Sequence, residues 1–526
     1  MAAPSKSKWI ILVIALVLIA GGASIALLQS SREQTVLDFI ETIPGNLKAE
    51  NVEVGLFDGK ITVHGLKGDL TLFEEAPLEL SIDLLILDDA NLAAEADSGP
   101  TQLTGRLHVR NLDIKAPQEK WPLLGYDNFS FMEYSMDELW ADYAKLRPLA
   151  GSGKREAFAE ALLAMRFGAS VMTGFEGEWA GLPEMQNMPG APAFSRVTSA
   201  SVGRIECEPY TLTSFGKIIN TDQRFTYANG LTVSMKTSSL DSGAFPAALM
   251  RSVIAGDTSA MLDPEETLKI MAQGYVAKGL SCTELVFDIP EAGTLEIPDI
   301  GADVELGGGK LALRLKAEEI IVPVSTLQAL LPQWDMLFKE IRTPAMTFFN
   351  DFVVETVPEA EEMVRVNLLW NIGAKNLGSQ SMAVTLLGQA NKDPNEILPV
   401  KRDTLALTNG RLETHDQDFL RLAFATPLWA PVPENPQDSP QETAKARRDF
   451  FIAIIRDLAL EAPAQLREML NVGAAFVEQS GSLVITMEPE IPVALISFLN
   501  PSVVSFLNIK ALHTPPQTED DAQQQR

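Results

Sequence analysis

Alternation of apolar and polar residues, repeated in segment after segment, is the feature that most constrains the fold of this chain. A first example runs through residues 52–56 and 61–63, on either side of Asp58-Gly59. An Asp-Gly pair suits a type I′ turn, because both central residues of that turn need positive φ. A period of two with one apolar face predicts antiparallel strands that are buried on one side.

The same pattern recurs along most of the chain. Hairpin turns are predicted at Asn229-Gly230, Gly307 to Gly309 and Asn409-Gly410. Further alternating runs cover residues 78–87, 103–114, 280–289 and 364–372. Cys207 and Cys282 both fall in segments with strand character. In an oxidising compartment they are able to form a disulfide, and the simpler reading is two buried thiols. Two cysteines are too few for a disulfide scaffold or a zinc ribbon.

Helix signals stand between the predicted strands. Ser31 and Gln34 form a capping-box pattern, and Pro44-Gly45 ends the helix that it opens. Other predicted helices cover residues 135–146, 155–167, 263–274, a segment opening at 325, and 444–477 with a break at Pro463. The fold class predicted is therefore α+β, with an N-terminal transmembrane helix followed by antiparallel β-sheets that amphipathic helices cover.

The transmembrane prediction rests on Trp9 to Leu28, which contains no charged residue. Such a run is about 30 Å long as a helix, enough to cross the hydrocarbon core of a bilayer. Lys6 and Lys8 predict a cytoplasmic N-terminus by the positive-inside rule. The alternative is a cleaved signal peptide, since small residues around Ala23 and Ala26 fit a cleavage site. The length of the apolar run favours an uncleaved anchor.

Composition excludes one class of partner. A formal net charge of −28 predicts no nucleic-acid binding, because phosphate contacts need clustered Lys and Arg. With 526 residues the chain is long enough for several regions. The predicted regions are a cytoplasmic tip (1–8), the anchor (9–28), a β-rich region (29–118), a helical region (119–193), a central α+β region (194–426), a Pro-rich loop (427–443), a C-terminal region of helices and closing strands (444–513) and a disordered tail (514–526).

No motif in the sequence carries recognisable chemistry. Gly151 to Lys154 resembles the end of a phosphate-binding loop, but Arg155 replaces the Ser or Thr that would hold a metal ion. His415 to Asp418 is the one place where imidazole and carboxylates crowd together, and a solvated strand end explains it. We therefore expect no catalytic, cofactor-binding or metal-binding residues and no enzyme activity. An incompletely covered apolar sheet face is able to take acyl chains, whereas a face covered by helices is an ordinary core; the lipid-facing candidates are Leu311, Leu313 and Leu315.

The layout resembles bacterial AsmA-like and YdgA-like envelope proteins. The resemblance is carried by the uncharged N-terminal run, the helix ending at Pro44, and the segment from Asn51 through Leu66. It implies a single-pass inner-membrane protein with its body in the periplasm, tethered to the lipid bilayer through residues 9–28. The leading hypothesis is a non-enzymatic protein that supports cell-envelope biogenesis by handling phospholipid on an amphipathic sheet. The alternative is a periplasmic scaffold that binds envelope proteins and no lipid.

Overall fold

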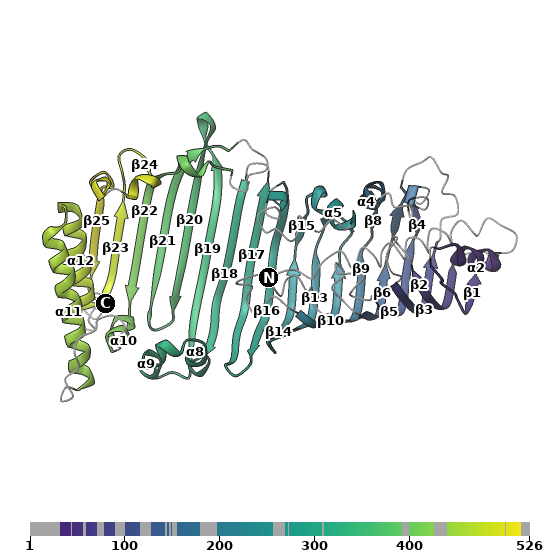
Figure 1. Cartoon of the computed structure of the whole chain (residues 1–526), viewed down its shortest axis with the longest axis horizontal. Coiled ribbons are helices and arrows are strands. Elements are labelled where there is room, and N and C mark those ends of the chain that lie inside the picture. The colour runs from purple at the N-terminus through teal and green to yellow at the C-terminus, as the bar shows by residue number, and fades with distance from the viewer. Residues whose placement is uncertain are drawn as a thin grey trace, which may run out of the picture. The chain divides into compact units, whose positions relative to one another are not determined.

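The computed structural model divides the chain into two compact units, Met1–Phe287 and Asp288–Arg526 (Figure 1). We call them the first and the second unit. The residues that it describes are 32–516, apart from residues 44, 56–58, 71–77, 90–99, 116–127, 143–144, 147–148, 150–154, 179–196, 256–268, 272, 308–309, 392–398, 426–438 and 500. Each unit is built on antiparallel strands, as the alternating sequence predicts.

The first unit contains a long antiparallel sheet in which neighbouring strands follow one another along the chain. Its strands are, in spatial order, β1 (Asn51–Val54), β2 (Ile61–Leu70), β3 (Leu78–Asp88), β5 (Arg106–Lys115), β6 (Asn128–Met136), β9 (Ser170–Glu178), β10 (Val197–Cys207), β13 (Ile218–Tyr227) and β14 (Thr232–Leu240). β16 (Tyr275–Ile289) pairs with β14.

A second row of short strands pairs alongside this sheet. It consists of β4 (Thr101–Thr104), β7 (Leu139–Ala141), β8 (Arg166–Phe167), β11 (Tyr210–Thr211), β12 (Ser214–Phe215) and β15 (Ser242–Ala244). Each short strand is joined to a long one by one to three residues, so the second row continues the long strands across a bend. Gly168 stands at one bend, where a Cβ would lie 2.6 Å from the backbone nitrogen of Glu138.

The two rows and three helices enclose the core of the first unit. The helices are α2 (Arg32–Thr42), α4 (Arg155–Leu163) and α5 (Ala247–Ala255), and each contributes buried side chains to the same cluster as the strands. Leu85 of β3, Val109 of β5 and Ile40 of α2 have at most 1% of their surface exposed. The apolar face of this sheet is therefore closed.

The second unit is a meander of long strands (Figure 1). In spatial order its strands are β17 (Gly293–Gly307), β18 (Lys310–Pro323), β19 (Ala345–Pro358), β20 (Met363–Ala374), β21 (Gly378–Gln389), β22 (Ala406–Asp416), β23 (Gly481–Met487) and β25 (Ile509–Thr514). The two-residue strand β24 (Val493–Ala494) pairs with the start of β22.

Helices pack against this second sheet near its ends. α8 (Val324–Leu330) contacts β17 and β18, and α9 (Asp335–Lys339) follows it. α10 (Phe419–Ala425) packs on α11 (Pro440–Glu461), which packs on α12 (Ala464–Gln479), and α12 contacts β23 and β25. A capping box at Ser439 and Glu442 begins α11.

The predicted fold class is wrong in two respects. Amphipathic helices do not generally cover the sheets: strand dominates, and the alternating faces are closed by the second row of strands in the first unit and left partly exposed in the second. The inference failed because a period of two shows that one face is apolar and does not show what packs on it.

The membrane prediction also needs correction. Among the residues that the structure describes, no helix is both long enough and apolar enough to cross a membrane. The predicted anchor at residues 9–28 lies outside the described residues. The structure therefore does not support the predicted transmembrane helix, the signal anchor or the single-pass inner-membrane localisation.

Two local predictions are wrong for identifiable reasons. Residues 135–146, predicted as a helix, contain the end of β6 and all of β7, because the apolar residues there serve two strands separated by a bend. Asn409-Gly410 is no turn and lies inside β22. Gly410 fits there because a Cβ would lie 2.7 Å from the Cε of Met487 on the neighbouring strand.

Other local predictions are confirmed. The hairpins β1–β2, β13–β14 and β17–β18 form at the predicted places. α2, α4, α8 and the pair α11 and α12 match predicted helices, with Pro463 between the last two. Of the two thiols predicted to be buried, Cys282 is buried and Cys207 is only partly buried. The predictions for residues 151–154, 182–192, 427–438 and most of 263–274 lie outside the described residues.

Candidate functional site

Two apolar rows cross the sheet of the second unit from β17 to β25. Residues that pair directly across antiparallel strands point to the same side, so the register defines each row. The first row is Val304, Leu313, Val354, Leu368, Val384, Gly410, Met487 and Ile509. The second row is Ala302, Leu315, Phe352, Trp370, Met382, Leu412, Ile485 and Ala511. We call these sixteen residues the apolar face.

The opposite side of the same strands is polar. Asp303, Arg314 and Arg411 lie in one of its rows together with Val353, Leu369 and Ala383, and Lys316, Asp351, Asn371, Ser381 and Glu413 lie in another. Neighbouring groups on this side pair with each other: Asn367 donates to the Glu355 carboxylate at 3.0 Å, and Arg411 lies 3.0 Å from Glu413. The sheet is therefore amphipathic along its whole width.

The apolar face is open to solvent on β18 and β20. Leu315 is 37% exposed and Trp370 is 38% exposed, whereas the equivalent residues of the first unit, such as Leu85 and Val109, are fully buried. Trp370 directs its indole N–H to the side-chain oxygen of Asn350, 2.9 Å away on the same side of the sheet. Water therefore reaches side chains that would form the core of an ordinary domain.

The helices explain where this face is covered. One buried cluster forms where α8 and α9 meet the ends of β18 and β19, and it includes Val322, Leu327 and Met346. A second forms where α10, α11 and α12 meet β23, and it includes Phe424 and Phe476. The strands between these clusters carry the exposed part of the apolar face.

The structure places the predicted lipid-facing residues together on β18. Leu311, Leu313 and Leu315 alternate along the strand and point to the apolar side, and none of the three is fully buried. Leu315 is the most open. Leu311 lies at the end of the face, where its backbone N–H donates to the Thr356 hydroxyl at 2.8 Å. The sequence did not indicate that seven further strands extend the same rows.

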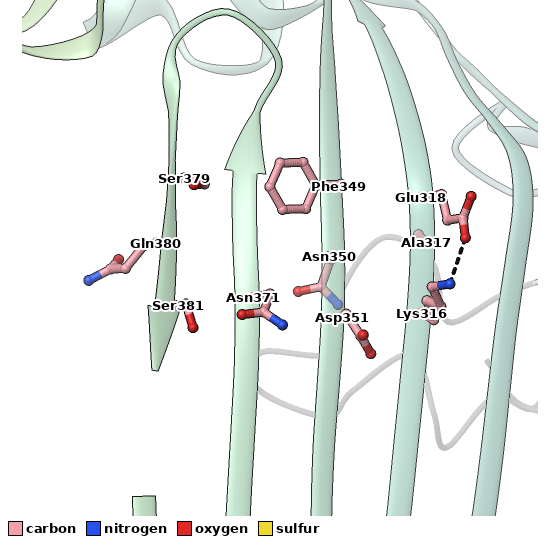
Figure 2. A pocket seen from close by; sticks show the side chains of 10 residues that line it. All are labelled: Lys316, Ala317, Glu318, Phe349, Asn350, Asp351, Asn371, Ser379, Gln380 and Ser381. Carbon is pink, nitrogen blue, oxygen red and sulfur yellow. Dashed lines mark hydrogen bonds and ion pairs between the residues drawn. The ribbon is translucent and has the colours of Figure 1, made fainter. Parts of the chain in front are cut away.

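A hollow of about 410 Å³ lies across β18 to β21 (Figure 2). Lys316, Asp351, Asn371 and Ser381 line it in one cross-strand row, with Phe349 beside them. The Lys316 ammonium lies 2.5 Å from the Glu318 carboxylate, an ion pair that raises the pKa of Lys316 and lowers the pKa of Glu318. With its cation paired and its remaining groups mostly amides and hydroxyls, the hollow offers no nucleophile next to a base.

His415 and its neighbouring carboxylates make structural contacts. The His415 Nδ1 lies 2.7 Å from the Ser482 hydroxyl on β23, and Asp416 accepts a hydrogen bond from the backbone of Leu420 at the start of α10. Asp418 pairs with Arg421 through both carboxylate oxygens at 2.6 Å. Within the described part of the chain, no cluster of three or more His, Cys, Asp or Glu side chains is arranged to hold a metal ion.

A buried polar group lies in the first unit. Tyr134 of β6 is buried, and burial raises its pKa to about 12, a shift that hydrogen bonding to Tyr210 partly offsets. Burial also raises the pKa of Tyr210 well above its ordinary value. The Tyr210 ring stacks on Phe167 with centroids 4.7 Å apart. Because both phenols stay protonated at neutral pH, they act as hydrogen-bonding groups of the core.

Comparison with known proteins found no counterpart of this chain: no protein-family model, no curated protein and no solved structure matches it. The proposed function therefore rests on the fold and on the amphipathic sheet alone.

Proposed function

We propose that the second unit binds the acyl chains of phospholipids on its apolar face, and that the chain is a non-enzymatic lipid-handling protein in cell-envelope biogenesis. The observation that supports this most directly is the exposure of Leu315 and Trp370 on a continuous apolar face. Large exposed apolar surfaces on folded proteins usually serve binding.

The size of the face suits a lipid chain. Eight strands spaced by about 4.8 Å give roughly 30 Å across the sheet, about twice the ~15 Å that the acyl chains of one leaflet occupy. Neither row contains a charged residue. An acyl chain lying along the rows would meet hydrocarbon and aromatic side chains, while the opposite face keeps its charges in water.

Native mass spectrometry of the full chain, purified without detergent, tests the proposal with two matched variants. Leu315 is 37% exposed on the apolar face and Leu369 is 39% exposed on the polar face, so the same substitution changes one face at a time. We expect phospholipid adducts on the unmodified protein. L315D should reduce them roughly tenfold, because one large apolar contact is worth at least a decade in affinity. L369D should leave them unchanged.

The opposite results would count against lipid handling. A bare mass for the unmodified protein would do so, as would equal lipid occupancy in both variants. A bare mass accompanied by a stoichiometric partner protein would instead favour the scaffold function.

A further inference from the structure

The segment that connects β23 to β25 has its two ends joined by strand pairing and hydrogen bonds. Met487 and Ile509 pair across the two strands, and the backbone N–H of Glu488 donates to the carbonyl of Leu507 at 3.1 Å. The Asn508 side chain donates to the Glu488 carbonyl at 3.2 Å. Leu507 is only 3% exposed and fixes the returning arm. The residues between these contacts therefore begin and end at a defined base.

Those residues carry no ionisable group. Between Glu490 and Lys510, none of residues 491–509 is Asp, Glu, Lys, Arg or His. We call the described residues 491–499 and 501–508 the apolar loop. Ile491 is 76% exposed, Ile496 is 71% exposed and Phe506 is 67% exposed. Surface loops are normally polar, and isolated exposed apolar residues need no explanation, but several large ones on one uncharged loop do.

The apolar loop is continuous with the end of the apolar face. Its strand β24 pairs with β22, where Val493 lies opposite Leu407. Leu407 in turn lies opposite Leu386 of β21, and Leu386 lies opposite Val366 of β20. The row therefore runs from the middle strands of the second unit directly into the loop.

A bilayer suits this surface better than a protein partner does. The loop is built of short 3₁₀ turns, Leu495–Leu499 and Pro501–Phe506, which do not form the extended flat face of a helix or strand. Hydrocarbon requires no complementary shape, only apolar side chains without charge. The charged residues Glu488, Glu490 and Lys510 stand at the base of the loop, where they would remain in water, and Lys510 lies 3.5 Å from Glu488.

We propose that the apolar loop inserts into the surface of a phospholipid bilayer and so places the end of the apolar face at the membrane. The net charge of −28 and the acidic residues at the base of the loop specify a zwitterionic surface, because an anionic one would repel the protein. This inference rests on the proposed function only in assigning lipid exchange as the purpose of docking. Docking of the loop does not itself require lipid binding by the apolar face.

Flotation of the full chain with phosphatidylcholine vesicles tests the docking. We expect the unmodified protein to float and I496D and F506D each to reduce the bound fraction roughly tenfold, because each removes a large inserted side chain and adds a charge. M132D is the matched control, since Met132 is 63% exposed in the first unit. Vesicles containing phosphatidylglycerol should bind more weakly, and the difference should shrink as salt is added.

Lipid occupancy, measured by native mass spectrometry on the same samples, separates this proposal from the proposed function. Loss of flotation in I496D with adducts retained supports docking. Absence of flotation by the unmodified protein overturns docking and leaves lipid binding standing. L460D tests another strongly exposed apolar position, at the end of α11, where Leu460 is 75% exposed. The docking proposal would also be overturned if L460D abolished flotation and I496D did not. The same holds if no protein floated and I496D instead abolished self-association.

Discussion

Leu315 of β18 and Leu369 of β20 are equally exposed, yet they belong to opposite faces of one sheet. Leu315 lies in a row that is apolar throughout, while Leu369 lies between Val353 and Ala383 in a row that also holds Asp303, Arg314 and Arg411. Exposure alone therefore does not distinguish the two leucines. The composition of their rows does, because only the row of Leu369 contains charged residues.

The open face should tolerate a charge that the closed core cannot. L313D should leave the protein folded while abolishing phospholipid co-purification, because Leu313 is only partly buried and a carboxylate there keeps access to water. V109D should unfold the first unit, since Val109 is fully buried and an unpaired carboxylate costs on the order of 4 kcal/mol there. Urea melts followed by circular dichroism compare the two. Loss of the cooperative melt in L313D would show that the leucine belongs to a core.

Alkaline pH should destabilise the first unit through Tyr134. Its folded pKa of about 12 lies above the ordinary value of 10, so the neutral phenol is the form that the fold favours. The associated stability is complete below pH 10 and is lost as the pH rises towards 12, amounting to roughly 2 to 3 kcal/mol for two pKa units. Thermal melts between pH 8 and 12 should show a smaller decline in Y134F. An equal decline in both proteins would assign the loss to other groups.

Gly378 has a backbone conformation that residues other than glycine rarely adopt. At Gly410 glycine is favoured only because a side chain there would crowd Met487. Gly378 has a φ of +143°, and a Cβ there would lie 2.3 Å from the carbonyl oxygen of His415. G378A should therefore cost about 3 kcal/mol. A Cβ at Gly410 meets the mobile end of Met487, so G410A should cost less than about 1 kcal/mol. Chemical denaturation measures both, and equal costs would contradict the assignment.

The capping box of α11 should make the helix pH-dependent. Ser439 accepts a hydrogen bond from the Glu442 backbone, and its hydroxyl and backbone N–H both donate to the Glu442 carboxylate, which lowers the pKa of Glu442. The stabilisation is present above the ordinary pKa and is lost as the pH falls through the lowered one. S439A should lower the stability of the helix by about 1 kcal/mol at pH 7. The difference in stability between the unmodified protein and S439A, measured by thermal melting, should narrow below pH 4. A constant difference would count against the role of the Glu442 carboxylate.

Local patterns in the sequence predicted most strands and turns. They did not predict which elements cover the strands. Alternation identified β3, β16 and β20, and the uncapped break at Pro463 separated α11 from α12. The predicted helix at 135–146 failed because a bend between β6 and β7 shifts the alternation, giving spacing that resembles a helical one. Which strands become neighbours, and so which leucines join one row, is a long-range property that spacing along the chain does not contain.

The candidate face was predictable only in part. Leu311, Leu313 and Leu315 could be singled out from their alternation, but the same alternation in β3 and β5 leads to a closed core. The difference arises from the second row of short strands and the helices in the first unit, which are contacts between distant segments. The apolar loop had a readable signal, the absence of any ionisable residue from 491 to 509, which marks an unusual surface loop.

The meander of the second unit also has a consequence for how it opens. From β17 to β22 each strand pairs with the next strand in the chain, so each contact closes a short segment. Such an arrangement resembles a repeat array, in which stability is a sum of nearest-neighbour contributions. Amide exchange in these strands should therefore be graded, protected where α8 and α12 clamp the ends and faster between them. A bound acyl chain that crosses several strands would contact all of them at once, and so would make their opening cooperative.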